Sequence, residues 1–529
     1  MQPALLLTLI DMTAINTSSP APIVLVGHSL AVLVAATERA YRGLRTTIIN
    51  PGGPLGGRFA GVQAIGRCHE AGLQLYDFGA PDTAALPRVD SYEPMRFDDV
   101  ARFGGIVRRY VLSHQHTRPI SAPRMWLGGK LLPDMLLGQQ PGAIRHLPQS
   151  AAIHRELAIV ERAVRAESRL WHPANRTAWP EEGSAPADWK FTTGNLVFDY
   201  DTLSQQLHGR CLHDTLFAPY ARQLMHEDVG LLAVRHHARA GLPLYAPDSL
   251  LAALSGSPDA SGEGARHSYP DGSSIVALCQ QLVNVVRHTP TIRVLDDTVL
   301  RVRRDAQGFC LHTRQHGEIR CERLGWAQPV AQGLVAAGGP GLPEQSRYLP
   351  TMLGFIRLHA DNLSDNFSVV QAASADVGLY RVTSRTGCGA PTDAGMVELM
   401  VEAHPARFAE HHGPLSDSTA QMRAMLGDLV TMGLVRPQAQ PAAFEVLHQA
   451  EGRVLPTPAA LAMHAEAHAR LEAALPGIEL LGEAAGLFAD SLSDQIVQGL
   501  KAAQQPRSRS EGEAIPFVAR YRDTEMAAA

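Results

Sequence analysis

The chain has 529 residues, 45% of them hydrophobic and 19% charged, with a net charge of −5 and a pI near 6.5. This length and composition predict a globular protein with two or more domains or one interleaved pair. The slightly acidic balance gives no basic field, so nucleic acid is not an expected partner. No apolar stretch is long enough to cross a membrane as a helix, so we expect no membrane span.

The N-terminal segment 1–21 contains a short apolar run, Ala4–Ile10, which Asp11 interrupts. It lacks the positive region that begins an export signal. We therefore expect an arm that packs on the surface or on a second subunit, which leaves a homodimer or a partner protein open. The C-terminal segment 506–529 is expected to be a flexible tail.

The six cysteines are scattered and form no Cys-x-x-Cys pair. This pattern favours reduced thiols in a cytoplasmic protein over a disulfide framework or a zinc site. The segment 108–133 is interpreted as two or three strands, on which His114 and His116 share one face with a metal-ligand spacing. No third ligand is suggested nearby, so we expect no metal.

A strand–turn–helix–strand unit opens the globular part of the chain. The apolar, β-branched run Ile23–Val26 predicts a strand buried on both faces. A helix is expected from about Leu30 to Arg42, ended by Gly43, and a second strand over Arg45–Asn50. The helix N-terminus at the first turn favours a phosphate.

The glycine fingerprint of this first turn is degraded. Gly27 holds the first glycine position, but Ser29 replaces the second and Val32 the third. Asn50 ends the second strand where an acidic residue normally binds the ribose. An amide still hydrogen-bonds a hydroxyl group, with roughly half the energy of a charge-assisted bond.

The same turn also matches a nucleophile elbow, with Ser29 as the nucleophile of an α/β-hydrolase. Only about 20 residues precede it, and they carry no loop that would supply an oxyanion hole. We therefore place the hydrolase last.

The residues after the second strand carry a resemblance. Gly56, Gly57 and Arg58 come shortly after Asn50, and a segment with Asp77 and Gly79 comes next. In this order the segments resemble the FAD-binding superfamily of amine oxidases, protoporphyrinogen oxidase and UDP-galactopyranose mutase. The resemblance implies FAD as the cofactor, with glycines passing close under the pyrophosphate and flavin.

The C-terminal part of the chain adds to the resemblance. Residues 478–481 are read as a last strand, Gly482 and Gly486 as a turn, and residues 494–503 as a helix. The resemblance places Asp494, Gln495 and Ile496 at a helix N-terminus that faces the flavin, where a helix dipole stabilises negative charge. It also implies that the strand with Val299 contacts adenine through its backbone.

Candidate substrate residues follow from the resemblance alone, whereas catalytic residues stay unknown. The implied substrate-binding residues are Trp126, Tyr220, Arg222, Tyr380 and Arg381. Arg381 matches an arginine that holds a substrate phosphate in mutase relatives, because a guanidinium binds phosphate in a bidentate manner. The alternative is an arginine paired with Glu398 or Glu402 on a neighbouring strand.

The expected fold class is α/β, with a discontinuous Rossmann-type FAD-binding domain and an interleaved α+β substrate domain. The FAD-binding segments are expected at 22–110, 265–345 and 441–505, and the substrate segments at 111–264 and 346–440.

Three functions rank ahead of the hydrolase. The first is an FAD-dependent oxidoreductase that acts on a small organic substrate, with specialised metabolism as one setting for it. The second is a redox-neutral enzyme like UDP-galactopyranose mutase. The third is a partner subunit that binds FAD poorly, which the residues at positions 29, 32 and 50 motivate. We rank them in that order.

Overall fold

The structure is a computed structural model, and the residues it describes cover most of the chain. They are 22–78, 86–92, 102–137, 141–166, 200–234, 237, 240–245, 247–256, 267–342, 347–455, 457–487 and 490–504. The expected N-terminal arm, the expected tail and Gly79 lie outside these residues.

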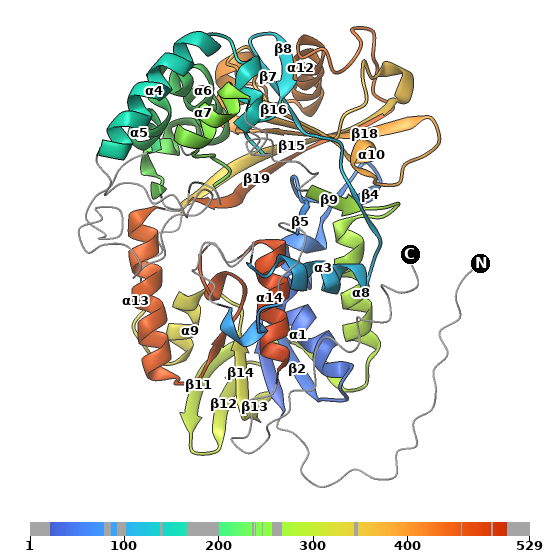
Figure 1. Cartoon of the computed structure of the whole chain (residues 1–529). Helices are drawn as coiled ribbons and strands as arrows, with labels where there is room; N and C mark the ends of the chain where they lie inside the picture. The colour runs from blue at the N-terminus through green and yellow to red at the C-terminus, as the bar shows by residue number, and fades with distance from the viewer. Residues whose placement is uncertain are drawn as a thin grey trace.

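A five-stranded parallel sheet forms the centre of the lower half of the molecule (Figure 1). In spatial order its strands are β10 (Ile292–Asp296), β2 (Thr46–Asn50), β1 (Ile23–Val26), β14 (Arg323–Trp326) and β20 (Glu479–Leu480). The side chains of β1 alternate between two separate hydrophobic clusters, one on each face of the sheet. Because both faces are buried, the strand is apolar throughout, and the predicted first two strands are confirmed to within one residue.

One face of this sheet is covered by four helices. They are α1 (Leu30–Ala40), α3 (Gly104–Leu112), α8 (Ile275–His288) and α14 (Leu492–Ala503). Gly499 lets α14 pack closely on α1, because a Cβ atom at this position would lie 2.5 Å from the Cβ of Val34. The last helix therefore lies directly against the first one.

The other face carries a second layer of strands and two helices. An antiparallel sheet of β11 (Val299–Asp305), β12 (Gly308–Thr313) and β13 (Gly317–Cys321) packs there beside α9 (Val330–Ala336) and α13 (Pro458–Ala474). Gly308 and Gly317 both have positive φ and begin strands after tight turns, where glycine adopts this conformation without strain.

A seven-stranded mixed sheet forms the upper half of the molecule (Figure 1). In spatial order its strands are β19 (Ala443–Leu455), β15 (Arg347–His359), β18 (Met396–Ala403), β17 (Arg381–Ser384), β16 (Val369–Ala372), β7 (Arg124–Leu127) and β8 (Lys130–Pro133). Two clusters of buried residues join this sheet to its helices. These helices are α4 (Ser150–Ala166), α5 (Tyr200–Leu212), α6 (Ala218–Met225) and α7 (Pro247–Ser255) in one cluster, and α11 (Pro405–His412) and α12 (Ser418–Thr431) in the other.

Short strands lie between the two large sheets. They form the pair β3 (Val62–Ala64) and β4 (Arg67–His69), and the sheet of β5 (Tyr76–Asp77), β9 (His267–Pro270) and β6 (Thr117–Pro119). The segment 108–133 thus contains three strands, but it begins inside helix α3. The strand interpretation was wrong there, because Ile106, Val107, Tyr110 and Val111 recur with a helical period and are buried together.

The strands show which segments build which sheet. The parallel sheet takes strands from 22–110, 265–345 and 441–505, which agrees with a discontinuous domain. However, β19 pairs with β15 in the large sheet, although it falls in the last of these segments. The strand pairing therefore favours a boundary after Leu455 instead of at 441, and the domain division stays a proposal.

A buried cluster of charges joins the two halves of the molecule, and we call it the Arg385 cluster. Arg385 in α10 (Arg385–Cys388) donates to Glu70 Oε2 at 3.1 Å and to Glu398 Oε2 at 2.9 Å. Glu70 Oε1 also accepts hydrogen bonds from the Tyr269 hydroxyl group and from the backbone N–H of Ile275, the first residue of α8. Glu398 belongs to β18, so one guanidinium ties the large sheet to α8.

Buried histidines make the stability of the fold depend on pH. His208 in α5 accepts a hydrogen bond from the backbone N–H of Tyr245 and faces the Ser204 hydroxyl group at 3.0 Å. Burial, with a smaller contribution from His213, lowers the pKa of His208 to about 3. The unfolded imidazole has a pKa of about 6.5. The neutral folded form is therefore fully stable above pH 6.5 and loses stability as the pH falls from 6.5 towards 3.

We expect His208→Gln to flatten this pH dependence, because glutamine keeps a hydrogen-bond acceptor but does not titrate. Urea unfolding at pH 7.5 and pH 5.0 measures the difference, and His208 should account for about 2 kcal/mol of the stability that the wild type loses. His288→Gln, at an exposed position, serves as the control. Equal losses in the wild type and in His208→Gln would contradict the prediction.

Within the described residues, no helix combines the length and the hydropathy that a membrane-spanning segment requires.

Candidate functional site

The first turn, the glycines after β2 and the turn after β20 meet at the carboxyl end of the parallel sheet. A Cβ atom on Gly57 would lie 3.8 Å from the Cα of Ser29, and one on Gly482 would lie 3.2 Å from the Cβ of Ser29. Gly57 and Gly482 both have positive φ. Three segments far apart in the sequence therefore surround Ser29 with backbone instead of side chains, as a close approach to a ligand requires.

The Ser29 hydroxyl group has no partner among the described residues. Ser29 holds the N-cap position of α1, yet its side chain makes no capping hydrogen bond, and its buried Oγ atom contacts no donor or acceptor there. A buried polar atom of this kind is costly unless a ligand or water satisfies it. A hydrolase nucleophile would instead need a hydrogen-bonded base. The geometry favours an anion at the α1 N-terminus over an elbow serine.

The side chains of His28 and Gln495 also lie at this first turn. The His28 imidazole lies against Gly53 and Gly57, where a Cβ atom would come within 3.3 Å and 3.7 Å of the ring. Burial lowers the pKa of His28, so the ring is neutral near pH 7. Gln495 reaches over from α14, and its Oε1 atom accepts a hydrogen bond from the backbone N–H of Ala31 at 3.2 Å. One first-turn amide of α1 is thus used by an amide side chain.

The three expected flavin contacts at the start of α14 differ from one another. Ser491 caps the helix by accepting a hydrogen bond from the Asp494 backbone N–H at 3.1 Å. The Asp494 carboxylate accepts a hydrogen bond from the Tyr92 hydroxyl group at 2.6 Å and is buried. Ile496 is fully buried in the core. Of the three, only Gln495 reaches the first turn with its side chain.

An acidic residue of the neighbouring strand β10 lies beside the end of β2. Asn50 is aligned with Asp296 of β10, and the Asn50 Nδ2 atom lies 3.4 Å from Asp296 Oδ1. Asn50 also binds the loop after it, through the carbonyl oxygen of Gly53 and the backbone N–H of Gly52. The Asp296 side chain is exposed. A carboxylate therefore stands beside Asn50, one strand away from where the fingerprint places an acidic residue.

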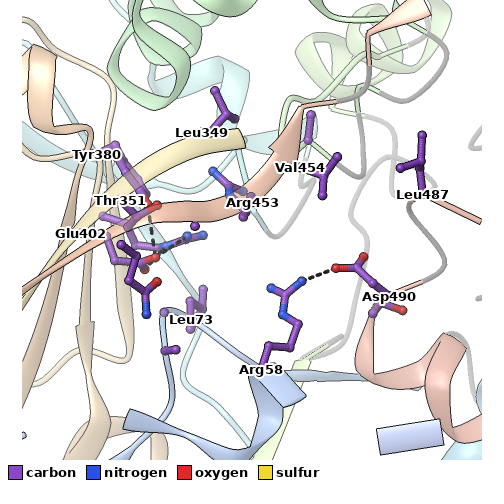
Figure 2. A pocket seen from close by; sticks show the side chains of 17 residues that line it. Arg58, Leu73, Leu349, Thr351, Tyr380, Glu402, Arg453, Val454, Leu487 and Asp490 are labelled. Atoms are coloured by element: carbon purple, nitrogen blue, oxygen red, sulfur yellow. Dashed lines mark hydrogen bonds and ion pairs between the residues drawn. The ribbon is translucent and has the colours of Figure 1, made fainter. Parts of the chain in front are cut away.

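A cavity of about 230 Å³ lies between the parallel sheet and the large sheet (Figure 2). Its wall on the parallel-sheet side holds Arg58 and Asp490, which form an ion pair. Its wall on the large-sheet side holds Thr351, Tyr380 and Glu402 (Figure 2). The cavity thus begins at the glycine turn and ends on the large sheet.

Arg381 is paired with an acid inside this cavity. Its guanidinium binds both oxygens of Glu402, with 2.9 Å from Nη2 to Oε1; Glu402 is buried and Arg381 is mostly so. Burial acts to lower the pKa of Arg381, but Glu402 holds it above its ordinary value. Burial and then Glu402 raise the pKa of Tyr380 to about 12, so its hydroxyl group stays protonated and faces Glu402 Oε1 at 3.3 Å.

Arg453 is a cation of this cavity that lacks a counter-charge among the described residues. It comes from β19 and is half-buried, and its guanidinium makes no hydrogen bond or ion pair with any of them. Figure 2 shows it on the large-sheet side of the cavity, beside Thr351 and across from Arg58. The other two arginines are each paired, so Arg453 leaves the cavity with an excess positive charge.

A second cavity, of about 190 Å³, shares Arg381 with the first. Tyr220 lines it with its hydroxyl group hydrogen-bonded to Gln371 Oε1 at 3.3 Å, and Asp77 and His267 also line it. Burial raises the pKa of Tyr220. The two cavities together place Tyr220, Tyr380 and Arg381 around one region.

The remaining expected site residues lie elsewhere. Trp126 is buried in a hydrophobic cluster of the large sheet, and Arg222 is exposed on α6; neither lines one of the two cavities. Val299 is half-buried at the start of β11, directly after the loop that leaves Asp296. Gly486 is buried in the turn between β20 and α14.

Sequence reasoning missed Asp296, Asp490 and Arg453. Asp296 carries a signal, because it is an acidic residue at the end of a strand that pairs with β2. Arg453 and Asp490 carry none, since only the folding of distant segments brings them to one cavity.

The fold, a parallel sheet of Rossmann type joined to a large mixed sheet, is shared with several solved structures. A structure of reduced UDP-galactopyranose mutase superposes with a TM-score of 0.59 at 13% identity, covering 92% of each chain. A putative protoporphyrinogen oxidase from Exiguobacterium sp. 255-15 gives 0.55 at 15% identity, covering 91% of this chain and 99% of that one.

Cyclohexylamine oxidase from Brevibacterium oxydans IH-35A gives a TM-score of 0.52 at 15% identity, covering 91% of this chain and 98% of that one. No family model matches the sequence, and no curated protein matches it. The expected resemblance is confirmed at the level of the fold.

Proposed function

We propose that the protein is an FAD-dependent enzyme that acts on a small organic molecule in the cavity between its two sheets. The observation that carries the proposal is the meeting of Gly57, Gly482 and the unpartnered Ser29 hydroxyl group at the N-terminus of α1. A helix N-terminus with a free hydroxyl donor and glycines packed beside it suits a pyrophosphate. An oxidoreductase ranks first among the possible activities.

The residues present fit a flavin nucleotide along one line. Ser29 and the α1 N-terminus would hold the pyrophosphate, and Asp296 with Asn50 would hold the adenosine ribose. Arg58 and the capped N-terminus of α14 would lie beside the flavin ring. Bound there, FAD supplies a two-electron acceptor, and the cationic side chain and helix dipole favour negative charge on it.

The cavity supports an anionic substrate. Arg453 is half-buried and without a counter-charge in the described part of the chain, so a carboxylate or phosphate would bind there with a charge-assisted hydrogen bond. Arg381 would orient the substrate less directly, because Glu402 already occupies its guanidinium. Tyr380 stays protonated and donates to Glu402, so its hydroxyl oxygen would accept a hydrogen bond from a substrate.

The visible spectrum of the purified full chain tests the cofactor. We expect flavin absorption bands in the protein as isolated, or after FAD is added and the excess removed. A protein that shows no bands under either condition would support the partner subunit that binds FAD poorly.

Ser29→Val is expected to weaken FAD binding about tenfold or more, because it removes the free donor and adds bulk beside Gly482.

Turnover separates the remaining activities. Oxygen or electron-acceptor consumption with small amines and acids is expected for the oxidoreductase, and substrates that carry an anionic group should be favoured. Isomerisation of a substrate by the reduced protein without net electron transfer would instead indicate the mutase-like enzyme. Equal rates for matched neutral and anionic substrates would contradict the role of Arg453.

A further inference from the structure

The helical side of the large sheet carries a second group of chemically reactive side chains, away from both cavities. His411 and His412 end α11, and Asp428 lies on α12. One ligand atom from each of the three residues lies within 4.8 Å of the other two. None of the three lines either cavity, so this group is independent of the proposed flavin site.

The two histidines converge although they are neighbours in the sequence. Consecutive side chains of a helix point about 100° apart, which usually separates them. In this protein the two rings lie edge to face with their centroids 4.5 Å apart, and both Nε2 atoms face the same carboxylate. The distances are 3.0 Å from His412 Nε2 to Asp428 Oδ2 and 3.8 Å from His411 Nε2 to Asp428 Oδ1.

The surrounding residues hold this arrangement in place. The backbone N–H of Gly378 donates to Asp428 Oδ2 at 2.9 Å, which orients the buried carboxylate. Gly378 also makes room for His412, because a Cβ atom at position 378 would lie 3.1 Å from the ring. Arg407, the cation nearby on α11, is paired with Glu410 at 3.0 Å. The site therefore has a fixed acid, a fixed ring and a neutralised cation beside it.

We propose that His411, His412 and Asp428 form a binding site for a divalent transition-metal ion, with Zn²⁺ as the expected ion. Two imidazole nitrogens and one carboxylate oxygen are ligands that Zn²⁺ accepts. With Zn–N and Zn–O bonds of about 2.0–2.2 Å, tetrahedral ligands stand about 3.4 Å apart, between the two distances observed in the structure. Three protein ligands leave a fourth position for water. The ion would join the end of α11 to α12.

Zinc titration of the untagged full chain, after treatment with a chelator, tests the site. We expect one Zn²⁺ per chain with micromolar or tighter affinity, measured by competition with a chromophoric chelator. His411→Ala and His412→Ala should each weaken binding at least about tenfold, in line with the loss of one of three ligands. His411 is exposed, so its variant keeps the fold.

Two matched measurements make the result specific. His464 and His468 form an i, i+4 pair on α13, so the double variant His464→Ala/His468→Ala controls for ordinary surface histidines and should bind Zn²⁺ as the wild type does. Co²⁺ should give a visible d–d band that His411→Ala abolishes. Unchanged Zn²⁺ affinity in His411→Ala/His412→Ala, loss of binding in the α13 control, or binding only at millimolar Zn²⁺ would each overturn the proposal.

Discussion

Replacement of Arg385 by methionine is expected to lower the free energy of unfolding by about 3–5 kcal/mol, more than any other substitution proposed for this protein. Arg385 is the shared partner of Glu70 and Glu398, and all three side chains are more than nine-tenths buried. Methionine fills similar space but leaves the buried Glu70 carboxylate without its cation, whereas Glu398 keeps Arg357, whose Nη2 atom lies 2.8 Å from Glu398 Oε1. Removing one partner of a buried ion pair costs far more than the pair itself contributes.

The loss should depend on pH in a definite direction. A buried carboxylate without a counter-charge costs the fold less when it is protonated, and protonation is favoured at lower pH. Arg385→Met should therefore be less destabilising at pH 5 than at pH 8. Urea unfolding curves at the two pH values measure this.

Arg88→Met provides a matched control, because Arg88 pairs with Asp90 at the surface with 63% and 47% of the side chains exposed. That substitution should change stability by less than about 0.5 kcal/mol. If Arg385→Met costs no more than the control, the cluster does not stabilise the joining of the two sheets.

The Arg385 cluster also shows which parts of the fold the sequence could predict. The strand Ile23–Val26, the helix after it and the turns before Gly308 and Gly317 follow from local patterns, because apolar periodicity and turn residues act over a few positions. The partners of Arg385 are 315 and 13 positions away. No local pattern specifies a contact at such a distance.

The candidate site also has a part that the sequence predicts and a part that it does not. Glycines 27, 57 and 482 are predictable, since glycine is required where backbone must approach a ligand closely or take a positive φ. The sequence leaves the pairing of Arg381 with Glu402 open as an alternative, and the structure shows that pairing inside a cavity. The role of Trp126 rests on resemblance alone, and its side chain is used by the hydrophobic core.

Asp296→Ala is expected to weaken FAD binding about tenfold to a hundredfold without unfolding the protein. The reason is the position of Asp296, which is aligned with Asn50 at the carboxyl end of the parallel sheet and is exposed. A hydrogen bond from a ribose hydroxyl group to a carboxylate is worth about 1.5–3 kcal/mol. Asp361→Ala, at an exposed position in the 3-10 helix Ala360–Asn362, is the control and should bind FAD as the wild type does.

The amide at position 50 avoids a second negative charge beside Asp296. Asn50→Asp would set a second carboxylate beside Asp296, whose Oδ1 atom lies 3.4 Å from the Asn50 side chain, so like-charge repulsion should prevent any gain in affinity. The exchange Asn50→Asp/Asp296→Asn restores one acid and one amide and should recover affinity to within about threefold, a factor worth less than 1 kcal/mol. FMN lacks the adenosine ribose, so its binding should be the same in all these variants. Wild-type FAD affinity in Asp296→Ala would show that β10 does not supply the missing acid, while the flavin proposal itself would stand.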